Sequence, residues 1–149
     1  MEIDPRGPRF GAAITVVVLA VVLITQSAWL LAAQLMVFAI GALAGLRFAP
    51  YGMLYRRLLR PRAGPPAHTE AEAPPRFAQA VGAVFALGGV ICFATGAAVA
   101  GIIFTAFALA AAFLNAAFDF CLGCQVYLFI QRIQPSSQRA VGPDREVYQ

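Results

Sequence analysis

The sequence predicts an all-α integral membrane protein with four transmembrane helices. Hydrophobic residues make up 60% of the 149 residues and charged residues only 12%, which is far from the composition of soluble globular domains. The apolar residues form two long runs, 10–46 and 77–120. Each run is too long for one crossing, because the hydrocarbon core takes about 20 helical residues. Each run must therefore fold as a helical hairpin.

Polar residues inside each run indicate where its hairpin turns. The first run is expected to turn near the adjacent polar pair Gln26-Ser27, and Trp29 follows at a depth that an indole ring prefers. The second run is expected to turn near Thr95-Gly96. The predicted helices span residues 10–25, 29–46, 77–95 and 101–120. Since the first apolar run continues into a second span, it does not have the pattern of a cleaved signal peptide.

The placement of the arginines predicts the orientation. All eleven basic residues are arginines, and they lie before the first hairpin, between the hairpins and after the second, while both turns have none. Because positively charged segments stay inside, both termini and the central loop are expected in the cytoplasm, in a multi-pass inner (plasma) membrane protein. The net charge of +4 follows from this bias. A nucleic-acid role has no support, because the arginines flank the spans.

The chain is expected to form one membrane domain over 1–133 and a disordered cytoplasmic tail over 134–149. Its halves, about 5–60 and 74–132, resemble each other and predict two parallel-repeat hairpins joined by a flexible proline-rich linker over about 61–75.

The matches between the halves are short. Pro-Arg-Phe opens both hairpins, and a shift of 72 residues pairs three further positions: Phe48 with Phe120, Tyr55 with Tyr127, and Arg60 with Arg132. The stretch 53–60 has the pattern of a surface helix, and 126–133 either lies on the surface or prolongs the fourth span.

The most distinctive polar residues are the two thiols of Cys121-Leu-Gly-Cys124. Counting about 20 residues from Gly101 places Phe120 at the inner membrane boundary, so both thiols are expected where lipid meets cytoplasm. Three residues apart on a helix, the two side chains face the same way, and a turn broken at Gly123 would also bring them together. Either geometry permits a disulfide-forming pair.

Two other polar features are weaker candidates. Asp119 could act as a base, but on a continuous helix it points about 160° from Cys121 and about 140° from Cys124. Asp119 lies on one face with Asn115, and at the interface it could instead pair with an arginine. Cys92, in the middle of the third span, is expected to be an inert small hydrophobic residue.

The cysteine pair has several interpretations. A structural disulfide is disfavoured on a reducing cytoplasmic face. A zinc site needs about four ligands, whereas the chain adds only His68, in the linker, so we predict no metal. A reversible dithiol needs only these two thiols and a thioredoxin-like partner. Chance spacing is the remaining alternative. No cofactor is predicted either, because the chain has no quinone, haem or flavin signature.

Several motifs together resemble one bacterial family. They are Asp4-Pro5-Arg6, Arg9-Phe10, Pro75-Arg76-Phe77-Ala78 and Phe120-Cys121-Leu122-Gly123-Cys124-Gln125-Val126-Tyr127. Over roughly residues 3–133 the chain resembles the bacterial membrane family catalogued as domain of unknown function 4395. The resemblance implies a four-span inner-membrane protein, often encoded beside thioredoxin-like and sulfurtransferase proteins in actinobacteria. It implies thiol or sulfane-sulfur handling at the motif positions Phe120, Cys121, Gly123, Cys124 and Tyr127.

The expected function is a thiol-redox or sulfur-transfer component of the membrane, with Cys121 and Cys124 as the working dithiol and Gly123 supplying backbone freedom between them. The expected partners are the lipid bilayer and a cytosolic thioredoxin-like or sulfurtransferase protein; a homo-oligomer stays open. The alternative is a non-enzymatic scaffold or anchor for a soluble partner, with incidental cysteines. A transporter ranks last, because few polar residues could line a path.

Overall fold

The computed structural model describes residues 2–64 and 69–133. The predicted tail over 134–149 and His68 lie outside the described residues. In chain order the elements are β1 (Glu2–Ile3), α1 (Arg6–Thr25), α2 (Ala28–Leu43), α3 (Pro50–Leu58), α4 (Arg60–Ala63), β2 (Glu70–Ala71), α5 (Ala73–Ala94), α6 (Ala98–Phe118) and α7 (Leu122–Ile133). The all-α prediction is confirmed.

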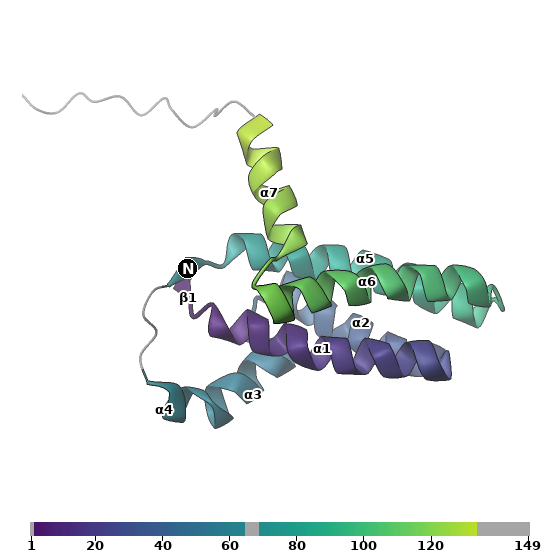
Figure 1. Ribbon diagram of the computed structural model, residues 1–149, viewed down its shortest axis with the longest axis horizontal. Coiled ribbons are helices and arrows are strands. Elements are labelled where there is room, and N and C mark those ends of the chain that lie inside the picture. Colours follow the sequence, from purple (N-terminus) through teal and green to yellow (C-terminus); the bar gives the residue numbers. More distant parts are fainter. Residues whose placement is uncertain (1, 65–68, 134–149) are drawn as a thin grey trace, which may run out of the picture.

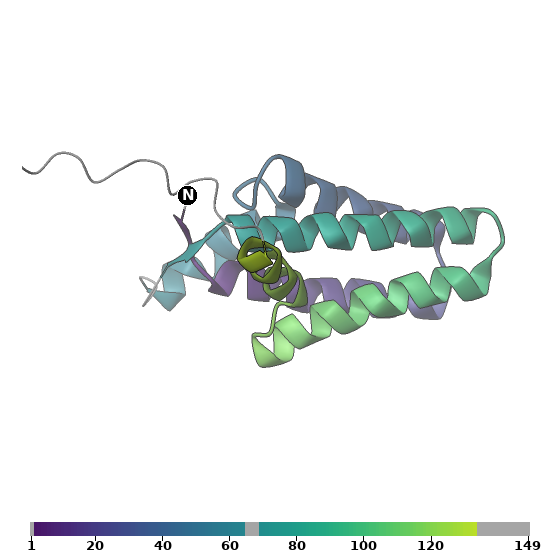
Figure 2. The same ribbon diagram turned by 90° about the horizontal axis from the view of Figure 1, so that it is seen from above.

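Four helices form an antiparallel bundle (Figures 1 and 2). The most extensive packing joins α2 to α5, α1 to α6 and α5 to α6, so each hairpin packs against the other. Within the described residues, α1, α5 and α6 are long and apolar enough to cross a membrane, with 20, 22 and 21 residues, whereas α2 is a shorter apolar helix of 16 residues.

The four bundle helices begin and end within a few residues of the predicted bounds. α1 and α5 begin earlier than predicted, at Arg6 and Ala73, because prolines are tolerated in the first turn, where their missing N–H has no helical acceptor. α2 ends earlier, at Leu43, where Gly45 follows with a φ of 100°. The first hairpin turns at Gln26, whose φ is 50°, and Ser27 caps α2 by accepting a hydrogen bond from the amide of Leu30 at 3.3 Å.

The bundle has an apolar core and an apolar outer surface. The core is made of Leu19, Val22, Leu31, Phe38, Ala86 and Ala108. On the outside, Ile24 is 82% exposed and Trp29 is 89% exposed, and large apolar side chains also cover the outer faces of α5 and α6. So much exposed apolar surface is not stable in water. The chain is therefore a membrane protein.

Arginines close the helix ends at one end of the bundle. This end, which we call the basic end, holds the starts of α1 and α5 and the ends of α2 and α6 (Figure 1). Arg76 donates three hydrogen bonds to the carbonyls of Ala42 and Leu43, at 2.9–3.2 Å. Arg9 donates one to the carbonyl of Ala116, at 3.1 Å. Each arginine thus caps a helix of the other hairpin.

The connection between the hairpins has more structure than the predicted flexible linker over 61–75. α4 extends to Ala63, β2 pairs antiparallel with β1, and α5 begins at Ala73. The pairing places Glu2 opposite Ala71 and Ile3 opposite Glu70, so the segments that precede the two hairpins are held together. Only a few residues between α4 and β2 lie outside the described part.

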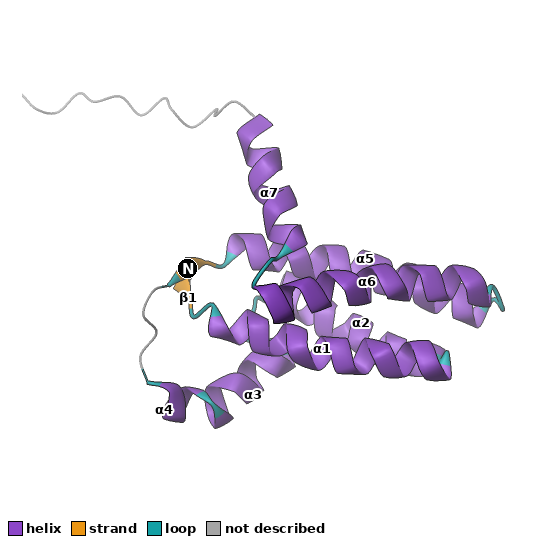
Figure 3. Cartoon of the chain, in the orientation of Figure 1, coloured by secondary structure: helices purple, strands orange, loops and turns teal. Residues whose placement is uncertain are grey.

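Two short amphipathic helices follow the hairpins (Figure 3). α3 contains most of the stretch predicted as a surface helix. α7 is a separate helix that runs across the bundle axis in Figure 1, so it does not prolong the fourth span, which was one of the two predictions for 126–133. Its large apolar residues, among them Phe129 and Ile133, are exposed. Such a helix fits the surface of a membrane.

Candidate functional site: the cysteine pair at the start of α7

The fourth long helix ends before the cysteines. Asp119 has a left-handed backbone with a φ of 57°, a conformation that Asp adopts more readily than most residues. The amides of Asp119 and Phe120 both donate to the carbonyl of Leu114, which closes the last turn of α6. The helix break therefore lies at Asp119–Cys121, rather than at Gly123 as one of the predicted geometries required.

The break places the cysteines at the N-terminus of α7. Cys121 immediately precedes the helix, Cys124 lies in its first turn, and the two form a disulfide with their Cα atoms 5.2 Å apart. The amide of Cys124 donates to Sγ of Cys121 at 3.3 Å, as it would to the side chain of a helix-capping Ser or Thr. Unsatisfied N–H groups at a helix N-terminus stabilise negative charge, so this position favours a thiolate on Cys121.

Gly123 has a packing role. It lies in the first turn of α7, where a Cβ atom would come within 2.6 Å of Cα and Cβ of Ala78 on α5. One helical turn further on, the ring of Tyr127 contacts Phe77 with 5.7 Å between centroids. The absence of a side chain at Gly123 therefore lets α7 approach α5 closely, which differs from the backbone freedom that we expected.

Asp119 ends α6 and does not contact the sulfur atoms. Its side chain is exposed, and within residues 2–64 and 69–133 it has no hydrogen bond to either cysteine and no arginine within ion-pair distance. The proposed roles as a base and as an arginine partner therefore have no supporting contact. Asn115, one turn earlier, is half-buried.

The third cysteine is remote from the pair. Cys92 is a free thiol on α5, 14 residues beyond Ala78, which corresponds to about 20 Å along the helix axis. Among the described side chains, no three His, Cys, Asp or Glu residues lie close enough to hold a metal ion. Cys121 and Cys124 can thus react with each other or with another molecule, but Cys92 is too far away to react with either of them.

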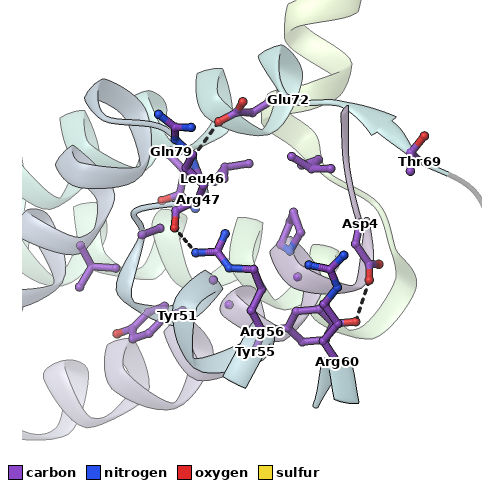
Figure 4. Close-up of a pocket in the computed structure, with 17 residues that line it drawn as sticks. Asp4, Leu46, Arg47, Tyr51, Tyr55, Arg56, Arg60, Thr69, Glu72 and Gln79 are labelled. Atoms are coloured by element: carbon purple, nitrogen blue, oxygen red, sulfur yellow. Dashed lines mark hydrogen bonds between the residues drawn. The ribbon is translucent and has the colours of Figure 1, made fainter. Parts of the chain in front are cut away.

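A second polar site at the basic end was not predicted from the sequence. It is a cavity of about 280 Å³ between α1, α3 and α5 (Figure 4). The charged residues that line it are Asp4, Arg47, Arg56, Arg60 and Glu72. Glu72 is buried and accepts a hydrogen bond from the amide of Leu46 at 2.9 Å, so this carboxylate holds the connection between α2 and α3.

Two tyrosines of α3 connect this cavity to the bundle. The hydroxyl of Tyr51 donates to Oε1 of the buried Gln34 at 2.7 Å, and Nε2 of Gln34 donates to Thr15 at 3.4 Å. The hydroxyl of Tyr55 donates to Asp4 at 3.0 Å. Burial raises the pKa of Tyr51, and burial together with Asp4 raises the pKa of Tyr55. The only sequence signal for this network is a polar Gln34 inside an apolar run.

The bundle and the cysteine pair together define a small helical membrane protein with a disulfide at the N-terminus of a surface helix. The family model described as domain of unknown function (DUF4395) matches residues 3–132, and the chain belongs to this family. Neither the proteins with curated descriptions nor the solved structures include a significant match to the chain.

Proposed function

We propose that the chain is a four-span inner-membrane protein whose basic end faces the cytoplasm. α2 lies alongside α5 in the bundle. Its 16 residues extend about 24 Å, which is shorter than the hydrocarbon thickness of about 30 Å by an amount that local thinning of the bilayer accommodates. With α1, α5 and α6 as the other spans, the arginines of the basic end lie on the side that positive charge favours.

We also propose that the two hairpins are parallel repeats. Equivalent residues make equivalent contacts: Phe10 with Tyr55 at 5.9 Å between ring centroids, and Phe77 with Tyr127 at 5.7 Å. Arg9 and Arg76 are likewise equivalent, and each caps the second helix of the other hairpin. Duplication of one unit followed by pairing of the copies explains both matches.

The function we propose is thiol-disulfide exchange or sulfur transfer with a cytosolic thioredoxin-like or sulfurtransferase protein. The single observation that supports it is the capping contact: Sγ of Cys121 lies against the amide of Cys124 at the start of α7. A helix N-terminus favours the thiolate that attacks, and the second cysteine, one turn on, is close enough to resolve the product.

The proposed exchange begins with the reduced pair. The Cys121 thiolate attacks a disulfide of the partner, so that a mixed disulfide forms and one partner thiolate leaves. The thiolate of Cys124 then attacks Sγ of Cys121, which forms the disulfide between the two cysteines and releases the second partner thiolate. Two electrons pass to the partner, whose thiolates take up the protons that the two cysteines lost. The reverse sequence would oxidise the partner.

Sulfur transfer would use the same sulfur atom. The Cys121 thiolate attacks the outer sulfur of a partner persulfide, so Cys121 becomes the persulfide and the partner leaves as a thiolate. No oxidant or reductant is consumed in this transfer, because the sulfane sulfur only changes its carrier.

The test is a trapping experiment in membranes. With Cys124→Ser the resolving thiol is absent, so we expect a mixed disulfide between Cys121 and a cytosolic protein, visible on a non-reducing gel and lost on reduction. Cys121→Ser should trap none or far less, and Cys92→Ser is the matched control with normal behaviour. Unchanged labelling of both cysteines under reducing and oxidising conditions, without a trapped species, would contradict the proposal and favour the anchoring alternative.

A further inference from the structure

The cavity at the basic end has a lining that the cysteine chemistry does not use. Arginines and hydrogen-bond acceptors line it together with apolar residues such as Ile3, Val37 and Leu46. From this lining we propose that the cavity binds a phosphate ester that carries a neutral hydroxyl group, as a lipid headgroup or as a soluble molecule.

The anionic end of the ligand is indicated by the arginines. Figure 4 shows Arg56 and Arg60 reaching toward the cavity from α3 and α4. Arg56 also donates to the carbonyl of Arg47, which ties the two residues together. Guanidinium groups bind phosphate oxygens with two parallel hydrogen bonds, so arginines from different segments converging on one space suit a phosphate.

The charge balance favours an anionic ligand. Three arginines and two carboxylates line the cavity, which leaves one excess positive charge. Asp4 is engaged by the hydroxyl of Tyr55, and Glu72 by the amide of Leu46. The negative charge of a phosphate ester neutralises this excess, so the ligand needs no cationic group.

The hydroxyl group is indicated by Gln79. Its Oε1 is buried and has no hydrogen-bond partner among the described residues, and its side chain packs against Gly41 of α2. A buried acceptor without a donor is unfavourable, so a hydrogen bond donated to this oxygen would favour binding. Of the ligand groups that donate without adding charge, a hydroxyl is the simplest.

The cavity has the right size and place for such a ligand. A volume of about 280 Å³ exceeds that of a bare phosphate and accommodates a glycerol phosphate group. It opens at the basic end, where the proposed spans meet the membrane surface and anionic headgroups are concentrated. The lipid and soluble sources share their chemistry, so the experiment has to separate them.

The experiment uses the full chain in nanodiscs and measures ligand retention by native mass spectrometry and thermal stabilisation. One arm compares phosphatidylglycerol with phosphatidylcholine, and the other adds glycerol 3-phosphate or propyl phosphate to phosphatidylcholine discs. Binding in the first arm only identifies a lipid headgroup, and binding in the second only identifies a soluble ester. Absence of binding in both arms overturns the proposal.

Two variants and a control test the lining. Arg60 is exposed, so Arg60→Gln should leave the fold intact. The substitution should weaken ligand binding about tenfold, because it removes one charge-assisted hydrogen bond to the phosphate. Gln79→Leu should abolish the preference for glycerol 3-phosphate, or for phosphatidylglycerol, over a counterpart without hydroxyls. Arg57, on α3, is also exposed but does not line the cavity, so Arg57→Gln should bind the ligand normally. Equal weakening by Arg57→Gln and Arg60→Gln would overturn the proposal, because it would indicate attraction to surface charge in general.

Discussion

The starts of α3 and α7 correspond to each other under the 72-residue shift of the proposed repeat, and they carry different side chains. In each helix, the amide of the residue four positions after the capping residue donates a hydrogen bond to the carbonyl of the capping residue. The pairs are Met53 to Ala49 in α3 and Gln125 to Cys121 in α7. The residues that could cap differ, however: Ala49 has no side-chain acceptor, whereas the sulfur of Cys121 accepts from Cys124. The same backbone hydrogen bond therefore occurs beside the cavity at the start of α3 and beside the cysteine pair at the start of α7.

The comparison shows that the side chains, and not the backbone at the start of each helix, decide which polar groups are present there. With a shift of 72 residues, Ala49 and Gly52 occupy the places of Cys121 and Cys124. Around α3 the neighbouring groups are Tyr51, Tyr55 and Glu72, which build the polar cavity. α7 instead runs across the bundle axis and packs its first turn against α5.

The largest expected effect comes from the glycines in the two first turns. Gly123→Ala would force Cβ against Ala78 of another helix, so we expect a loss of about 1–3 kcal/mol in unfolding free energy and partial separation of α7 from α5. Gly52→Ala meets only the carbonyl of Leu46 in the adjacent connection and should cost less. Thermal unfolding in detergent measures both.

The rate at which dithiothreitol reduces the disulfide is the second measurement for this pair. Gly123→Ala should accelerate the reduction because α7 is no longer held on α5, whereas Gly52→Ala should leave the rate unchanged. Identical rates in the two variants would show that packing on α5 does not protect the cysteines.

Arg76 and Arg9 join the two hairpins, and Arg76 should contribute more to the free energy of unfolding because it donates more hydrogen bonds. Arg76→Gln removes up to three hydrogen bonds to the end of α2 and should destabilise the bundle by about 2 kcal/mol. Arg9→Gln removes one bond to the end of α6 and should cost about 1 kcal/mol. Denaturant titration of each variant, followed by circular dichroism, provides the comparison; a larger cost for Arg9→Gln would contradict it.

The smallest effect concerns pH. Burial and Asp4 raise the pKa of Tyr55 above its ordinary value of 10.0, so the folded protein holds this proton more tightly than the unfolded chain does. The resulting stability is complete below pH 10 and is lost as the pH rises through the folded pKa. Tyr55→Phe should remove the part of the alkaline loss of stability that comes from this hydroxyl. At neutral pH the variant should lose about 1 kcal/mol of unfolding free energy, because the hydrogen bond to Asp4 is missing.

The control for this prediction is Tyr127→Phe, at the position that the 72-residue shift pairs with Tyr55, where the ring contacts Phe77. Unfolding midpoints of both variants and the parent are compared between neutral pH and pH 11. If Tyr55→Phe retained the whole alkaline loss of the parent, burial of this hydroxyl would not be its source.

The sequence by itself determined the class of protein, the helices and the position of the turns. These follow from the length of apolar runs, from prolines and from polar turn residues, all of which act within a few residues. Short local matches in the sequence also paired Phe10 with Phe77 and Tyr55 with Tyr127, and in the structure Phe10 contacts Tyr55 as Phe77 contacts Tyr127. The capping position of Cys121 was not, because it depends on Asp119 adopting a left-handed backbone.

Only the tertiary structure decided what surrounds the polar residues. Gln79, Glu72 and Asp4 lie far apart from α3 in sequence, and no spacing rule connects them to Arg56 or Arg60. They meet because α5 packs on α2 and because β1 pairs with β2. In the same way, Gly123 acquires its packing role only when α7 is placed on Ala78. Contacts between distant segments depend on the assembly of the whole bundle, and a local pattern does not encode them.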